Sequence, residues 1–195
     1  VMLQGFTWNS APRGTSWNKE NPSPYWGKWY DIMKKNASSI KDTFGYVWFN
    51  PPSICDSSSS EGYAPTELNN LNSYYGTADE LKEVIQAIQP AKAIADIVVN
   101  HRAGSTCWGD FTNPDWGVVK GVKYPAICSD DEGFDASSGD KDHMVGKPSG
   151  AADTGASYSA YRDLDHTNTN VQEGIIAWMN DVHPCDDSFL NIGVR

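Results

Sequence analysis

The stretch Ala93-Ile-Ala-Asp-Ile-Val-Val99, followed directly by Asn100-His-Arg102, decides the fold class of this chain. Its apolar run predicts a strand buried on both faces, which is typical of parallel sheets covered by helices. Asp96 interrupts that run. Because a charge in such a strand is costly unless it is paired or hydrogen-bonded, we expect the Asp96 carboxylate to have a partner.

Short apolar runs alternate with amphipathic helical patterns on both sides of this strand. Three further strands are predicted, at Met2–Phe6, Tyr46–Phe49 and Phe189–Val194. Helices are predicted from Ser23-Pro24 to Ile40, from the capping box Thr77-Ala-Asp-Glu80 to Ile88, and from the cap-like Asn170 to Val182. This order predicts a β/α architecture with parallel strands, either as an open doubly wound sheet or as half of a (β/α)8 barrel.

The alternation stops between Arg102 and about Arg162. This part of the chain is rich in Gly, Asp, Ser and Pro. Its apolar residues keep neither the spacing of a helix nor the alternation of a strand. A structureless loop of that length is unusual in a compact domain, so we expect an inserted lobe with contacts of its own.

Composition narrows the function classes. The chain has 195 residues, enough for one full-sized core, and its formal net charge of −10 argues against nucleic acid or an anionic membrane surface as a partner. No apolar stretch approaches the roughly 20 residues that span a bilayer. The four cysteines allow two disulfides in three pairings, and they favour an oxidising, extracellular or secretory location: Cys55, Cys107, Cys128 and Cys185. Val1 is not followed by a cleavable apolar segment, so any signal peptide would lie upstream.

Candidate functional residues follow the predicted strands. In α/β folds the carboxyl ends of the strands meet at one rim, where ligands bind. Trp8 follows the first strand, Tyr63 lies in the loop after the second, His101 follows the third, and Arg195 ends the fourth. We therefore expect these side chains to lie at one rim of the sheet.

The residues around that site resemble a known family. Asp96-Ile-Val-Val-Asn-His-Arg102 resembles the first signature motif of the alpha-amylases, glycoside hydrolase family 13. Further stretches resemble the plant-type branch in the order expected for it: Gln4-Gly-Phe-Thr-Trp8, Pro51-Pro-Ser53, Glu61-Gly-Tyr-Ala-Pro65, Tyr75-Gly76, Asp153-Thr-Gly155, Asp163-Leu-Asp-His166 and Gly193-Val-Arg195. The resemblance implies the first half, with four strands, of a (β/α)8 TIM barrel with an inserted irregular lobe after the third strand. Its boundaries would be residues 1–101 for the barrel start, 102–162 for the lobe and 163–195 for the barrel continuation.

The resemblance also implies roles for single residues. Tyr63 and Trp8 would stack against a bound alpha-glucan such as starch or a maltooligosaccharide, His101 would hydrogen-bond it, and Asp96 would hold the active-site arginine and the strand ends. Asn100, Asp153 and Asp163 would supply oxygens to a Ca²⁺ ion, and the complete protein would be a monomer.

The catalytic carboxylates have no counterpart in the sequence. By the family pattern, the nucleophile, the acid/base and the transition-state stabiliser lie beyond Arg195, which would orient the nucleophile. The full-length protein would hydrolyse internal alpha-1,4-glucosidic bonds with retention, and this segment alone would be inactive. The alternatives are an alpha-glucan transglycosylase of the same superfamily and a non-catalytic glucan- or calcium-binding module. A nucleotide-binding doubly wound protein is disfavoured, because no Gly-rich phosphate loop follows the first strand.

Overall fold

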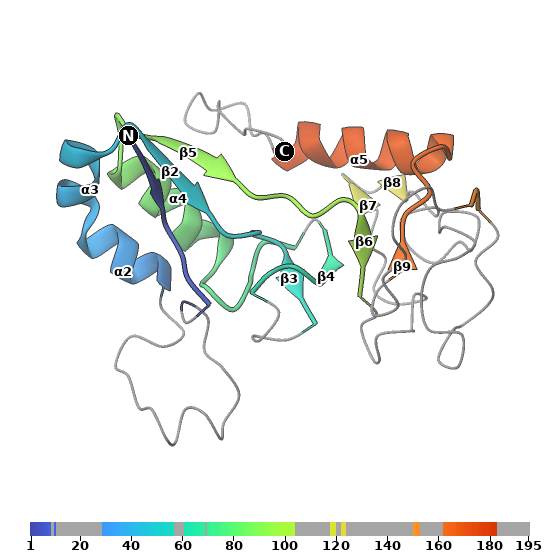
Figure 1. Cartoon of the computed structure of the whole chain (residues 1–195), viewed down its shortest axis with the longest axis horizontal. Coiled ribbons are helices and arrows are strands. Elements are labelled where there is room, and N and C mark those ends of the chain that lie inside the picture. The colour runs from blue at the N-terminus through green and yellow to red at the C-terminus, as the bar shows by residue number, and fades with distance from the viewer. Residues whose placement is uncertain are drawn as a thin grey trace, which may run out of the picture. The chain divides into compact units, whose positions relative to one another are not determined.

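A computed structural model of the chain describes residues 1–8, 10, 29–56, 61–68, 70–103, 118–119, 122–123, 150–152 and 162–182 (Figure 1). The described residues fall into two compact units. The first comprises residues within Val1–Tyr63 and Leu71–Ile97, and the second comprises residues within Ala64–Asn70 and Val98–Pro184. Among the described residues no helix combines the length and the apolar character that crossing a membrane requires.

A parallel sheet forms the centre of the first unit. Strand β2 (Tyr46–Phe49) lies between β1 (Met2–Gln4) and β5 (Lys92–Ala95) (Figure 1). Both pairings are parallel, and Val47 stands in register with Leu3 on one side and Ala93 on the other. The predicted parallel β/α alternation is thus confirmed for the first three strands. The two-residue strand β3 (Ile54–Cys55) follows β2 in the chain.

The third strand is shorter than predicted, and it is not fully buried. Its ladder with β2 ends at the pair Phe49 and Ala95, and the residues of 93–99 are half-buried. The backbone N–H of Asp96 still donates to Phe49 O at 3.3 Å. Beyond that bond, β2 continues into Pro51-Pro52, and proline has no N–H with which to extend a ladder. Asp96 therefore lies just after the strand and not within it.

Two helices replace the single helix expected up to Ile40. Helix α2 (Trp29–Lys35) and helix α3 (Ala37–Thr43) are separated at Asn36. The side-chain amide of Asn36 donates to Ile32 O at 2.8 Å, the same carbonyl that receives the Asn36 backbone N–H. Such side-chain bonds to the preceding turn compete with the helical ladder and interrupt it. The expected start at Ser23-Pro24 lies outside the described residues.

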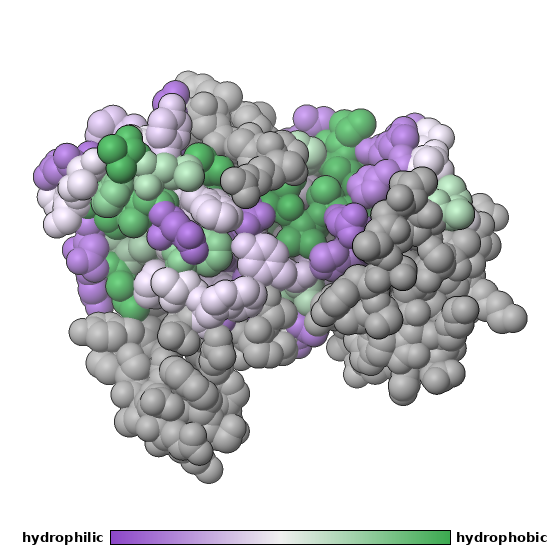
Figure 2. Space-filling view, in the orientation of Figure 1, coloured by the Kyte–Doolittle hydropathy of each residue, from purple (hydrophilic) through white to green (hydrophobic). Residues whose placement is uncertain are grey.

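The core of the first unit lies between the sheet and its helices. Helix α4 (Ala78–Ala87) begins with the predicted capping box: Glu80 N–H donates to Thr77 Oγ1 at 3.2 Å, and Thr77 N–H donates to Glu80 Oε2 at 2.7 Å. The buried side chains of the cluster come from β2, α2, α3 and α4 and their flanks: Tyr30, Met33, Ala37, Ile40, Val47, Phe49, Tyr75, Leu81, Val84, Ile85, Ile88 and Ala91. On the face shown in Figure 2, hydrophobic and hydrophilic residues are intermixed over the elements of this unit.

One group of three short strands in the second unit includes His101 and Arg102, the end of the stretch that resembles the first signature motif. They are β4 (Pro65–Glu67), β6 (His101–Arg102) and β9 (Arg162–Asp163). Strands β6 and β9 pair in antiparallel fashion, with His101 opposite Asp163 and Arg102 opposite Arg162. A second antiparallel pair, β7 (Val118–Val119) with β8 (Val122–Lys123), lies within the expected lobe. The fourth predicted strand, 189–194, lies outside the described residues.

The helix of the second unit begins earlier than predicted. Helix α5 (Thr169–Val182) has its cap at Asn168, whose Oδ1 accepts the backbone N–H of Asn170 at 2.9 Å. Asn170 is therefore the second helical residue and not the cap, because an N-cap side chain bonds the N–H two or three residues further on. The predicted apolar stripe is confirmed at Val171, Ile175 and Trp178, which are buried.

Candidate functional site

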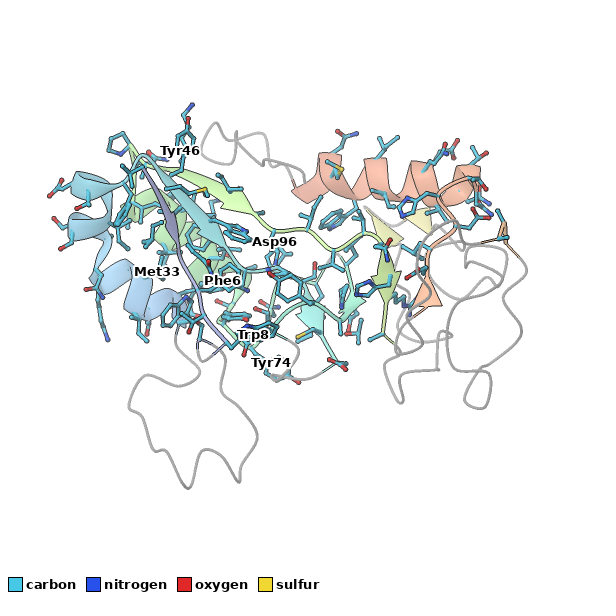
Figure 3. The ribbon with its side chains drawn as sticks, in the orientation of Figure 1. Phe6, Trp8, Met33, Tyr46, Tyr74 and Asp96 are labelled. Atoms are coloured by element: carbon cyan, nitrogen blue, oxygen red, sulfur yellow. The ribbon has the colours of Figure 1, made fainter. Side chains whose placement is uncertain are left out.

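Three of the predicted site residues meet in the first unit, beyond the carboxyl ends of its strands. Figure 3 shows Trp8 beyond β1 and Asp96 beyond β5. Tyr63 joins them: its hydroxyl donates to Asp96 Oδ2 at 2.8 Å, and its ring centroid lies 6.1 Å from that of Trp8 with the two planes tilted by 46°. The partner expected for the Asp96 carboxylate is thus a tyrosine hydroxyl.

The backbone that presents Tyr63 has a conformation that few residues adopt. Glu61 has φ 54° and Gly62 has φ 88°, so two successive residues lie in the left-handed region. A Cβ at position 62 would lie 2.7 Å from Pro51 O, so only glycine fits there. The loop therefore approaches the segment after β2 closely, and the residue that follows it is directed toward Asp96.

Sequence motifs alone predict no role for Glu61 in this loop or for Tyr75, which contacts it. The hydroxyl of Tyr75 donates to Glu61 Oε2 at 2.8 Å, and both side chains are about 1% exposed. A glutamate in a loop next to glycine is ordinarily solvated, so its burial has no sequence signature. The one available signal was that the two stretches containing these residues both resemble family motifs.

Burial and nearby carboxylates keep the site tyrosines protonated. The pKa of Tyr63 is raised, first by burial and then by the hydrogen bond to Asp96 and the charges of Asp96 and Glu61. The pKa of Tyr75 is raised by burial and by its bond to Glu61. Like any tyrosine, both phenols are hydrogen-bond donors at neutral pH, and the raised pKa extends the protonated form to pH values above about 10. The Trp8 side chain is 59% exposed, which leaves a flat apolar ring surface accessible to a ligand.

A separate polar cluster lies in the second unit. Asn100 Nδ2 donates to Asp163 Oδ1 at 2.9 Å, and Asn100 O accepts the Leu164 N–H at 2.7 Å. His101 is paired with Asp163 through the β6–β9 register. His166 Nε2 lies 2.9 Å from Val99 O. The structure thus places Asn100 next to Asp163, two of the residues expected at one calcium site, and His101 opposite Asp163 in the strand pair.

Two of the three predicted calcium ligands are neighbours in this cluster. Asn100 and Asp163 offer the hard amide and carboxylate oxygens that Ca²⁺ prefers. Asp153, the third, lies outside the described residues, as does Arg195. Within the part of the chain that the structure describes, no group of three or more His, Cys, Asp or Glu side chains could hold a metal ion. The amide and carboxylate oxygens of Asn100 and Asp163 are of the kind that calcium prefers.

Comparison with known proteins gives the same family as the motifs. No family model matches the chain. It is 31% identical over 184 residues to alpha-amylase 3, chloroplastic, of Arabidopsis thaliana, and 30% identical over 182 residues to probable alpha-amylase 2 of the same plant. Each match covers 92% of this chain, but only 18% and 37% of the respective relative, so the chain spans less than two fifths of either.

A solved structure shares the fold. The alpha-amylase from Geobacillus thermoleovorans, which was crystallised with acarbose, matches 93% of this chain and 38% of its own length, with a TM-score of 0.58 and 15% sequence identity. Amylase-family catalytic domains of this kind are TIM barrels, which fits the parallel β/α alternation of the first unit. The chain is therefore an alpha-amylase-type segment, similar to plant alpha-amylases over 92% of its length.

Proposed function

We propose that this chain carries the glucan-binding part of an active site that hydrolyses internal alpha-1,4-glucosidic bonds of starch-like glucans with retention of configuration. The observation that carries the proposal is the contact among Trp8, Tyr63 and Asp96 beyond the carboxyl ends of the parallel strands. Flat aromatic rings next to a hydrogen-bonding carboxylate suit a sugar ring, which has apolar faces and polar edges. The similarity to alpha-amylases supports the choice of an alpha-glucan.

Each residue has a definite task in this proposal. The Tyr63 ring stacks beneath a glucose unit while its hydroxyl stays bonded to Asp96, which prevents the ring from turning. Trp8 extends the apolar platform with its exposed face. By the family resemblance, His101 donates a hydrogen bond to a hydroxyl of the bound sugar, a contact that would be stronger in the transition state than in the ground state.

The bond-breaking groups are assigned by resemblance alone. A retaining glycosidase uses two carboxyl groups about 5–5.5 Å apart, one as nucleophile and one as acid/base. The family pattern places both after Arg195, which would orient the nucleophile. In this proposal the described residues bind and position the glucan, and they do not themselves cleave it.

We also propose a Ca²⁺ ion held by Asn100, Asp163 and Asp153. Both Asn100 and Asp163 are near the β6–β9 pair, and their oxygens are of the hard type that this ion requires. When bound, the ion supplies a cross-link between chain segments that are distant in sequence. Its contribution is to stability and not to bond cleavage.

The test is hydrolysis of starch by the purified protein, with the anomeric form of the products followed by proton NMR. Retention predicts that the alpha-anomer is released first. Trp8→Ala and Tyr63→Ala are expected to weaken maltooligosaccharide binding, whereas Tyr46→Ala is the matched control, since Tyr46 is also exposed but begins β2 at the opposite end of the sheet. Binding without hydrolysis in the complete protein would favour a non-catalytic module, and transfer products would favour a transglycosylase.

A further inference from the structure

Tyr75 belongs to the rigid core of the first unit. Its side chain is about 1% exposed, its carbonyl accepts the Tyr30 N–H at 3.2 Å, and the two tyrosine rings lie 6.3 Å apart at 33°. The next residue is packed just as closely, because a Cβ on Gly76 would lie 2.6 Å from Tyr30 Cδ2. The Tyr75 hydroxyl is therefore held at a fixed position beneath the loop that contains Tyr63.

Glu61 connects this fixed hydroxyl to the loop. Its Oε2 accepts the Tyr75 hydroxyl at 2.8 Å, and the Glu61 side chain is itself about 1% exposed. Its backbone has φ 54°, a value that a residue with a Cβ adopts only when the surrounding structure determines it. If the backbone at Glu61 relaxed and its side chain moved into solvent, the hydrogen bond from Tyr75 would be lost. This bond therefore stabilises the left-handed conformation of Glu61.

We infer that Glu61 is a positioning residue: anchored by the Tyr75 hydroxyl, it holds the Glu61-Gly62 turn in its left-handed form and so fixes the Tyr63 ring at the angle from which it meets both Asp96 and the ligand. The inference rests on the proposed function only in that the ligand is a glucan. A continuous path then runs from the core at Tyr75 through Glu61 to the site. The charge of Glu61 is one of the causes of the raised pKa of Tyr63, in agreement with their proximity.

The experiment reads the Tyr63 environment directly. The protein is labelled with tyrosine carrying 13C at Cζ, and the Tyr63 signal is assigned as the one missing from Tyr63→Phe. In Tyr75→Phe and Glu61→Ala we expect this signal to move toward the shift of an unstructured tyrosine and to broaden. In Glu61→Gln the amide oxygen still accepts the Tyr75 hydroxyl, so the signal should stay near its native position. Tyr74→Phe is the matched control, since it deletes the hydroxyl of the neighbouring half-buried tyrosine and leaves the Tyr75–Glu61 bond in place.

Glucan affinity is the second measurement, made by calorimetry with maltoheptaose. The dissociation constant should rise about tenfold in Tyr75→Phe and Glu61→Ala, the consequence of losing a hydrogen bond to a charged acceptor, and it should change less than about threefold in Glu61→Gln and Tyr74→Phe. If Glu61 had a merely structural role, recovery of glucan affinity in Glu61→Gln would not be accompanied by recovery of the native Tyr63 signal.

The outcomes separate the inference from the function on which it rests. An unchanged Tyr63 signal in a folded Tyr75→Phe protein overturns the positioning role. If circular dichroism shows that Tyr75→Phe and Glu61→Ala are both unfolded, the bond holds the core and not the loop, which also overturns it. If the wild type binds no maltoheptaose while the Tyr63 signal responds as described, the positioning role stands and the proposed function fails.

Discussion

Removal of the Tyr63 hydroxyl tests the central contact of the site. Tyr63→Phe keeps the ring, and with it the stacking surface, but it deletes the donor that lies 2.8 Å from Asp96 Oδ2. A hydrogen bond to a charged group contributes about 1.5–3 kcal/mol to stability. Both side chains are half-buried, so water can replace part of the lost bond. We therefore expect the free energy of unfolding to fall by about 1–2 kcal/mol.

Urea denaturation at pH 7 measures this loss, and a double-mutant cycle with Asp96→Ala, which removes the acceptor, isolates the pair. If the bond is direct, the two substitutions should not add, and the coupling energy should be about 1 kcal/mol. Tyr46→Phe, which removes the hydroxyl of an exposed tyrosine, should change stability by no more than about 0.5 kcal/mol. Maltooligosaccharide affinity should fall less in Tyr63→Phe than in Tyr63→Ala, because only the latter removes the ring.

A coupling energy below about 0.3 kcal/mol would refute the reasoning, since that is the additivity found between sites that do not interact. The same conclusion would follow if Tyr63→Phe and Tyr63→Ala weakened binding equally. In that case the hydroxyl, and not the ring, would be the part of Tyr63 that the ligand recognises.

Further predictions concern pH, helix capping, the metal and turnover. Burial raises the pKa of Tyr30 to about 12 and also raises the pKa of Tyr63 and Tyr75. A pKa that is higher in the folded state than the ordinary value of about 10 contributes stability that is present below pH 10 and lost as the pH rises above it. The urea midpoint should therefore decline from about pH 10 upward, and these groups should leave it unchanged between pH 7 and 9. Thr77→Ala removes the acceptor for the Glu80 N–H and should cost about 1 kcal/mol in urea denaturation, with Thr77→Ser restoring most of it. A calcium chelator should lower Tm, by the equivalent of about 2.7 kcal/mol where the free ion had been 100-fold above its dissociation constant, and an unchanged Tm would count against the metal proposal. His101→Ala should lower kcat more than it raises KM in the complete protein, and an unaltered kcat would remove His101 from the reacting sugar.

Much of the first unit could be predicted because its signals are local. The capping box Thr77-Ala-Asp-Glu80 specifies its helix start through contacts within one turn, and the apolar run Tyr46–Phe49 predicts a strand, in which Val47 and Phe49 are buried. The break at Asn36 could not be predicted by periodicity, because apolar spacing continues across it while the side chain bonds the preceding turn. The early end of β5 at Ala95 depends on Pro51 and Pro52, which follow β2 and lie more than 40 residues earlier in the sequence.

The sequence alone determined the parallel β/α order of the first three strands, the family resemblance and the place of Trp8 just after the first strand, because strand alternation and motif order are written along the chain. Only the tertiary structure decided that Tyr63 is the partner of Asp96 and that Glu61 is buried against Tyr75. The physical reason is range. Residue patterns report on neighbours within a helical turn or a strand, whereas a hydrogen bond between residues 33 positions apart exists only once the loop and the strand end have been brought together.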